Sequence, residues 1–336
     1  MKKFKAMTQK QRRLWILITA IVAVLASVTL TLTLIMRNAV PLNVSGFEID
    51  SGLYRYFVDT VRAAPASYGL VPGSPESSIR EEANKLAAEY AAIELQFKEK
   101  KARLNAADKA GASTEMNKIW HIFGTYYQSI GVEKSTLMRV YENRAKRDTL
   151  FAVLYDTGGS KAVAEKDVML AFGQNYIVFR GFSVPLTMVD EHGNNKPMAE
   201  ADKKTLQTKF KNMLLEAQSG KDLNNLYSSY YNTDGANLPI QILGKTENAG
   251  YSSDFFGKVQ KVKAGSYAVI ESGAEIYILQ RDATSPKDAE YFRRYRLPCL
   301  KILKGTEFDK QLAKDVAALK IDGSESLQKR VTKTVL

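Results

Sequence analysis

The pattern of apolar and polar positions begins with one uninterrupted apolar run. Residues 14–36 read LWILITAIVAVLASVTLTLTLIM, which is 23 positions without a charged side chain. A helix rises about 1.5 Å per residue, so a run of this length can cross the roughly 30 Å hydrocarbon core of a bilayer. The sequence therefore predicts a transmembrane anchor at 14–36.

Charge sets the predicted orientation of this anchor. Residues 1–13 carry six Lys and Arg side chains and no acid, and by the positive-inside rule they form a cytoplasmic tail. We expect a single-pass cell-membrane protein whose bulk, after Arg37, is extracytoplasmic. The alternative is a cleaved signal peptide. Its apolar region is usually about 7–15 residues long, and residues 37–41 make a poor cleavage site.

Residues 42–173 follow mainly the period of amphipathic helices. After a short strand or turn, a helix is predicted to start near Asp50 or Ser51. It carries Leu53, Tyr54 and Phe57 at helical spacing. Further helices are predicted over 78–105, 113–130, 133–155 and 164–173.

The pattern changes at 174. Residues 175–186, NYIVFRGFSVPL, are rich in aromatic and β-branched side chains and predict a strand. The following segments predict the order β-α-α-β-α-β-β, closed by a tight hairpin at Ser272-Gly273. The elements after the first strand are helices at 200–219 and 222–230, a strand at 239–243, a helix at 252–259, and strands at 266–271 and 274–280. The tail then returns to helix.

Composition excludes several classes of function. The chain is 45% hydrophobic and 25% charged, and its net charge of +12 is concentrated at the N-terminus. We interpret the rest as a mixed-charge surface and expect no nucleic-acid partner. Cys299 is the only cysteine, in an apolar context that favours a buried side chain, so no internal disulfide can form. His121 and His192 do not have metal-ligand spacing. No catalytic residue, cofactor or metal site is assigned.

Three stretches of the 175–282 segment resemble a parvulin-type peptidyl-prolyl isomerase domain. They are the strand 175–186, the helix-Gly-acidic-helix segment 215–230 (LEAQSGKDLNNLYSSY), and the closing stretch 255–282 (FFGKVQKVKAGSYAVIESGAEIYILQRD). The flanks, beginning with VSGFEI at 44–49, resemble the SurA and PrsA foldases. The resemblance extends over about residues 42–330 and rests on the order of these motifs.

The resemblance implies an α+β protein with an inserted domain. In those foldases a helical chaperone domain embraces a parvulin domain, and C-terminal helices return to the helical part. The predicted organisation is a cytoplasmic tail at 1–13, the anchor at 14–36, a helical SurA-like domain at 42–173, a parvulin-like domain at 174–284, and returning helices at 285–336.

The sequence departs from the active family at its two histidines. Aligning the first and last strands places Phe182 and Glu275 at these positions, and Asp234 lies nearest to the family's Cys or Asp position. The barrier to isomerisation is about 18–20 kcal/mol, and without both histidines we expect little or no catalysis. The positions assigned to the parvulin groove are Phe182, Val184, Asp234, Phe255, Phe256 and Glu275.

The resemblance implies a membrane-anchored chaperone that binds unfolded or partly folded exported proteins. The aromatic side chains of the helical region are the candidates to contact these clients: Tyr54, Tyr56, Phe57, Trp120, Phe123, Tyr126 and Tyr127. Two alternatives stay open. One is a scaffold subunit of an envelope complex that uses an inactive parvulin domain to bind a partner, and the other is an active isomerase with a divergent site. The sequence also leaves homodimer formation open.

Overall fold

The structure is a computed structural model that describes residues 22, 39–247, 249–282 and 290–333 of the chain. The predicted anchor at 14–36 lies, apart from Val22, outside the described residues. Among the residues that the structure describes, no helix is both long and apolar enough to cross a bilayer.

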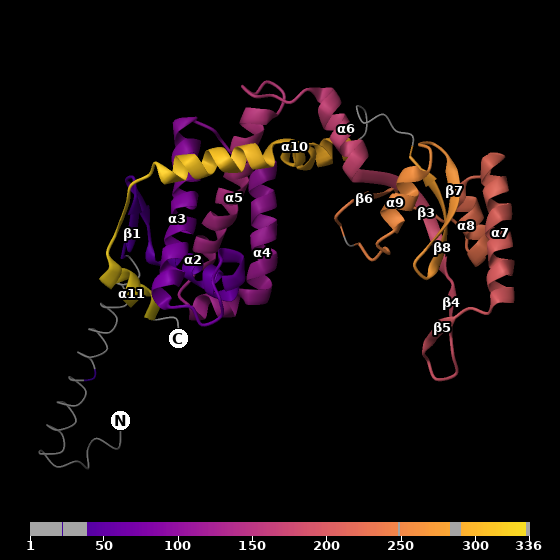
Figure 1. Cartoon of the computed structure of the whole chain (residues 1–336), viewed down its shortest axis with the longest axis horizontal. Coiled ribbons are helices and arrows are strands. Elements are labelled where there is room, and N and C mark those ends of the chain that lie inside the picture. Colours follow the sequence, from indigo (N-terminus) through magenta and orange to yellow (C-terminus); the bar gives the residue numbers. More distant parts are fainter. Residues whose placement is uncertain (1–21, 23–38, 248, 283–289, 334–336) are drawn as a thin grey trace, which may run out of the picture. The chain divides into compact units, whose positions relative to one another are not determined.

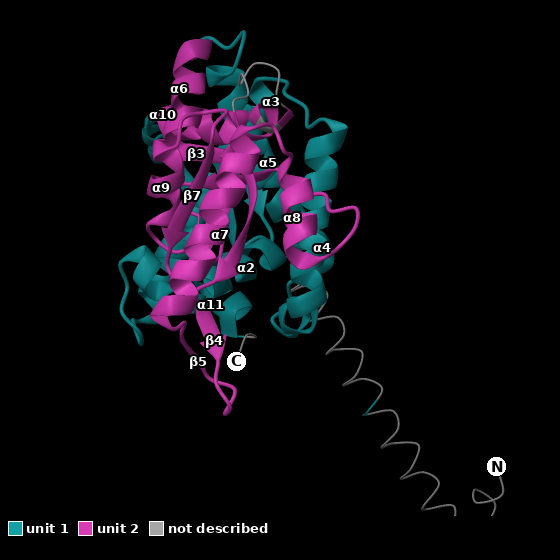
Figure 2. Cartoon of the chain, turned by 90° about the vertical axis from the view of Figure 1, so that its right-hand side faces the viewer, with its two compact units in different colours: residues 1–161, 306–336 teal, residues 162–305 magenta. Residues whose placement is uncertain are grey.

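The chain divides into two compact units (Figure 2). Unit 1 combines Met1–Lys161 with Thr306–Leu336, and unit 2 is Ala162–Gly305. In order, the elements of unit 1 are β1 (Leu42–Val44), β2 (Phe47–Ile49), α2 (Ser51–Ala63), η2 (Pro65–Tyr68), α3 (Glu76–Glu99), α4 (Ala106–Ser129), α5 (Lys134–Tyr155), the end of α10 (Glu290–Ala317), β9 (Ile321–Gly323) and α11 (Glu325–Lys333).

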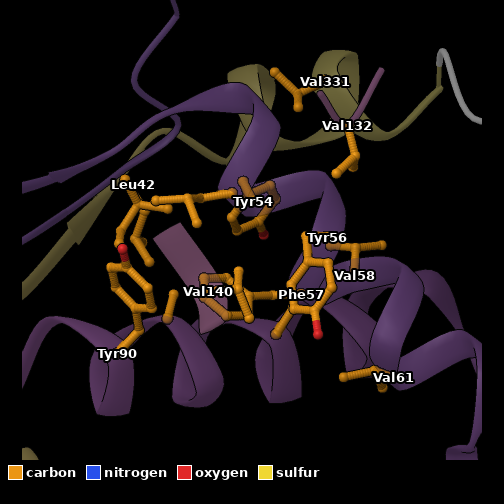
Figure 3. Close-up of a cluster of buried hydrophobic side chains, with 14 of the residues drawn as sticks. Leu42, Tyr54, Tyr56, Phe57, Val58, Val61, Tyr90, Val132, Val140 and Val331 are labelled. Carbon is orange, nitrogen blue, oxygen red and sulfur yellow. The ribbon is translucent and has the colours of Figure 1, made fainter. Parts of the chain in front are cut away.

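Helix α2 is the centre of unit 1. Asp50 begins it, because its carboxylate accepts a hydrogen bond from the backbone N–H of Leu53 at 3.0 Å. Apolar residues from neighbouring elements surround this helix (Figure 3). Leu42 comes from β1, Tyr90 from α3, Val140 from α5 and Val331 from α11. An apolar surface covered from so many sides makes α2 the core of the unit rather than a surface helix.

A small sheet joins the two ends of unit 1. Strand β1 is its middle strand and pairs antiparallel with β2 on one side and β9 on the other. The β1–β2 turn is tight because Ser45 and Gly46 both have positive φ, at 49° and 88°. The backbone N–H of Ser45 donates to the carbonyl of Lys320 at 2.8 Å. Strand β9 is a feature that the helical pattern of the tail did not predict.

Unit 2 contains the predicted β-α-α-β-α-β-β order with one addition, the β4–β5 hairpin. Its four-stranded antiparallel sheet has the order β6-β3-β8-β7. The elements are α6 (Glu165–Asn175), β3 (Tyr176–Pro185), β4 (Thr187–Val189), β5 (Asn195–Pro197), α7 (Glu200–Gln218), α8 (Leu223–Tyr231), β6 (Gln241–Gly244), α9 (Phe255–Lys261), β7 (Tyr267–Ser272), β8 (Glu275–Arg281) and the first part of α10.

Both faces of this sheet are covered by helices (Figure 1). Helices α7 and α8 pack on one face through a core that includes Phe210 and Ile278. Helix α9 packs on the other face through Phe255, Val259 and Leu279. Because successive residues of a strand point to opposite faces, each strand contributes side chains to both cores.

The limits of unit 2 differ from the expected 174–284. Helix α6 and the first part of α10 belong to it, because aromatic rings join them: the ring centroids of Phe172 and Phe292 are 5.5 Å apart and those of Tyr176 and Tyr295 are 4.7 Å apart. An ion pair between Arg296 and Glu165, at 2.6 Å, adds to this contact. The remainder of the tail, from Thr306, packs within the helical unit.

Arg55 connects distant parts of unit 1. It is 9% exposed, and its guanidinium donates to the carbonyl of Val331 at 3.1 Å and to that of Gly131 at 3.4 Å. We predict that Arg55→Met lowers the free energy of unfolding by about 1–3 kcal/mol, because two acceptors lose their donor. Urea titration of residues 38–336 measures this, since Trp120 is then the only tryptophan and reports on unit 1.

Arg62→Met on the same helix is the matched control. Arg62 pairs with Glu76 at 2.6 Å on the surface, so its loss is expected to cost less than about 1 kcal/mol. Equal destabilisation by the two substitutions would contradict the role assigned to Arg55.

Candidate functional site

Three of the seven aromatic residues predicted to contact clients are core residues. Tyr54, Tyr56 and Phe57 are 0%, 8% and 6% exposed (Figure 3). They lie on α2, which is covered by its neighbours, so the aromatic residues of this helix are part of the core. These three side chains are therefore not available to a client in the folded protein.

The other four lie on α4, where an apolar strip reaches the surface. Trp120 and Tyr127 are half-buried against the core, whereas Phe123 and Tyr126 are exposed. Ile122 is 67% exposed and was not among the candidates. The Tyr126 hydroxyl donates to Asp59, and this hydrogen bond is the main reason that the pKa of Tyr126 is raised to about 12.

A groove of about 570 Å³ opens on unit 1 where the C-terminal ends of α3, α5 and α10 meet. Its floor is apolar and buried: Ala92, Phe308 and Leu312 are each no more than 5% exposed. Half-buried leucines form its walls. Nothing in the sequence pattern indicated this groove, because it joins segments more than 200 residues apart.

Polar side chains surround the apolar floor. Asp315 accepts one hydrogen bond from Gln96 and one from Gln311, both at 2.9 Å. On the α5 side, Lys161 forms an ion pair with Glu307 at 3.2 Å. The groove therefore combines an apolar interior with a charged rim, which is an arrangement suited to amphipathic chain segments.

The residues predicted to form the parvulin groove do not meet at one place. Phe182 and Val184 face the α7–α8 core, where the Phe182 ring lies 5.2 Å from that of Tyr227. Glu275 pairs with Pro185 across the β3–β8 ladder and, by strand alternation, faces the α9 side. Phe182 and Glu275 thus lie on opposite faces of the sheet.

The remaining groove positions are also separated. Phe255 and Phe256 are buried in the core beneath α9. Asp234 is exposed in the loop between α8 and β6.

Ser183 and Tyr277 are the cross-strand partners on the α9 face. Tyr277 is 7% exposed, and its pKa is raised by burial and by a hydrogen bond with Glu275. The Tyr251 ring stacks on Phe255 with centroids 4.3 Å apart. Aromatic rings therefore occupy much of this face. The two histidines are elsewhere, with His192 in the β4–β5 turn and His121 on α4.

Cys299 is a buried side chain of α10. Cys299 is 0% exposed, and burial raises the pKa of its thiol to about 11, which disfavours the reactive thiolate. Within the described ranges, no three His, Cys, Asp or Glu side chains are grouped to hold a metal ion. Asp254 has its pKa lowered by hydrogen bonds from Lys258, Ser272 and Ser252, and this cluster ties the β7–β8 hairpin to α9.

No protein-family model and no curated protein matches the sequence. Among solved structures, the chain is similar to the foldase protein PrsA of Lactococcus lactis, with 14% identity, coverage of 88% of this chain and 99% of that one, and a TM-score of 0.38. PrsA of Streptococcus pneumoniae has 10% identity, coverage of 89% and 100%, and a TM-score of 0.38. A SurA-like chaperone of Campylobacter jejuni has 12% identity, coverage of 86% and 100%, and a TM-score of 0.29.

These solved structures belong to the group of foldases that the sequence resembles. Their identities are below 25% and their TM-scores are below 0.5.

Proposed function

We propose that this protein is a membrane-anchored, extracytoplasmic chaperone of the SurA and PrsA foldase type. It binds unfolded or partly folded exported proteins and does not catalyse prolyl isomerisation. The observation that carries the proposal is the open apolar groove of about 570 Å³ in unit 1. A groove of this size with a charged rim can accept side chains of an unfolded chain without exposing a large apolar surface.

The energetics of this groove suit transient binding. Each apolar side chain that a client buries contributes about 1–3 kcal/mol, and ordering of the flexible client opposes this gain. The exposed strip of Ile122, Phe123 and Tyr126 on α4 offers a second contact. Affinity is therefore expected in the micromolar range, which lets the client leave and fold.

The order of elements in unit 2 supports a parvulin-like domain that has lost its catalytic groups. The chain contains no third histidine, and neither of the two it has lies on the sheet. On the α9 face, Ser183 and Tyr277 form the cross-strand pair. Fold and catalysis separate readily, so such a domain can persist as a binding module.

The apolar segment 14–36 supports the anchor and the orientation of the proposal. Protease added to cells stripped of their wall is predicted to degrade residues 40–336, because the basic flank keeps only the N-terminus inside. Deletion of 1–37 is the control and is expected to release the protein from the membrane fraction. Full protection of the intact chain would rule out this orientation.

Suppression of aggregation tests the chaperone function. Residues 38–336 are predicted to keep an unfolded model protein in solution at a near-stoichiometric ratio, as measured by light scattering. Leu95→Ser, in the groove wall, should reduce this capacity several-fold because it removes apolar contact area. Val71→Ser, at an exposed loop position that does not line the groove, is the matched control and should have no effect.

The scaffold alternative gives the opposite result in this assay. A scaffold subunit would leave aggregation unchanged and would instead bind one folded envelope protein. Binding that survives high salt supports apolar contact, because salt screens charges and not apolar area.

The isomerase alternative is tested separately. In a protease-coupled assay on an Ala-Pro peptide, residues 38–336 are predicted to leave only the uncatalysed relaxation, about tens to hundreds of seconds at 25 °C. The physical reason is that no titratable histidine faces the sheet. Catalysis that disappears on Tyr277→Phe would instead identify a divergent active site.

A further inference from the structure

We infer that the groove of unit 1 selects client segments in which a Lys or Arg lies beside apolar residues. This inference rests on the proposed function and adds the chemistry of the bound segment. It combines three observations: a carboxylate without a counter-ion, the convergence of three helix C-termini, and an apolar floor next to both.

The first observation concerns Asp315. Both of its carboxylate oxygens are held in place, one by the amide of Gln96 and one by the amide of Gln311, each at 2.9 Å. These donors are neutral, and Asp315 forms no ion pair with any residue that the structure describes. The side chain is only half-buried, so a ligand can still reach it. A pre-oriented carboxylate that lacks a cation is a ready partner for one.

The second observation is the arrangement of helix ends. Helix α3 ends at Glu99, α5 at Tyr155 and α10 at Ala317, and residues from the last turns of all three line the groove. A helix C-terminus carries about half a negative charge, which favours a cation within the last turn. The last turn of α10, which contains Asp315, and the end of α3, whose Gln96 bonds it, therefore add to the negative potential at this carboxylate.

The charged side chains at the rim of the groove determine its local charge. Glu99 lines the groove and adds a second carboxylate. Lys161 also lines it, but Glu307 neutralises that side chain at 3.2 Å. Lys100 is exposed and forms no ion pair with either rim acid in the described part of the chain. The α3–α10 side of the groove therefore carries the two carboxylates of Asp315 and Glu99 against the single ammonium of Lys100.

The third observation determines what lies beside the cation. Phe308 and Leu312 are on the same helix as Asp315, about two turns and one turn before it respectively, and belong to the groove floor. A Lys or Arg side chain has an aliphatic stem that packs on such a surface while its charged end reaches the carboxylate. The neighbouring residue of the client then fills the rest of the groove. We commit to an extended polypeptide as the occupant, because it supplies both groups on one chain.

Peptide binding tests the inference on the full chain in nanodiscs, with empty nanodiscs as the blank. The probes are labelled peptides of one apolar sequence that carry Lys, Arg, Gln or Glu at the central position, and the readout is fluorescence anisotropy. The Lys and Arg peptides should bind about 3–10-fold more tightly than the Gln peptide, as expected for one partly exposed ion pair. The Glu peptide should bind most weakly.

Two substitutions localise this preference. Asp315→Asn should abolish it, so that the Lys, Arg and Gln peptides bind with equal affinity. Gln311→Lys places a cation at i, i+4 spacing from Asp315 and should abolish it as well, at an exposed and therefore tolerant position. Asp309→Asn is the matched control, because Asp309 is on the same helix and pairs with Arg147 outside the groove. It should keep the preference.

The outcomes distinguish failure of the proposed Lys and Arg preference from failure of the proposed chaperone function. Equal affinity for the Lys, Gln and Glu peptides, or a preference that survives Asp315→Asn, overturns the inference while the chaperone function stands. Failure to bind any of the peptides, together with failure to suppress aggregation, overturns the proposed function itself. A preference for a free small cation such as spermidine over the Lys peptide would also overturn the inference, because the apolar contact would then contribute nothing.

Discussion

The pairing of β1 with β9 is the interaction on which unit 1 depends. It pairs Leu42 with Gly323 and Val44 with Ile321. At the end of this ladder the Ser45 hydroxyl and N–H both bond the backbone of Lys320, which is 275 positions away. The chain leaves unit 1 after α5, forms the whole of unit 2, and returns along α10. Closing so long a loop has an entropic cost that grows only slowly with its length. The strand pairing, the buried Arg55 bridge and the packing of Val331 offset that cost.

The groove is a direct consequence of this closure. Its lining comes mainly from α10 on one side and α3 on the other, and the hydrogen bond between Gln96 and Asp315 joins the two. The two helices are separated in sequence by unit 2, so the groove exists only in the closed protein. A site built in this way links client binding to the integrity of the fold, because loss of the β1–β9 pairing would also release the groove wall.

Unit 2 is governed by a different constraint, which is the two-residue period of its strands. Residues of β3 and β8 alternate between the α7–α8 core and the α9 core, so a shift of one residue moves a side chain to the other face. Phe182 and Glu275 illustrate this, since each lies on the strand expected for it and yet they do not share a face. Both faces are filled by apolar and aromatic side chains, which pack the sheet against the helices on either side.

The sequence by itself determined most of the elements and their order. The spacing of apolar residues identified α2, α3, α5 and α7 and the strands of the sheet, because the periods of helices and strands depend only on local backbone geometry. The sequence also shows the apolar run at 14–36, and it shows that Phe182 and Glu275 stand where the resemblance implies two histidines. The extra elements were missed, because β9 and β4 are three residues long and are stabilised by partners distant in sequence or by a turn.

Only the tertiary structure decided which side chains are available. Tyr54 and Phe123 have the same character in sequence, yet one is 0% and the other 47% exposed, because α2 is enclosed and α4 has an open face. In the sequence, Asp315 is indistinguishable from the other acidic residues of the tail. Its environment is distinctive only because the fold brings Gln96 of α3 beside it. Periodicity reports which face of a helix is apolar, but whether another segment covers that face is decided by contacts between residues far apart in the chain.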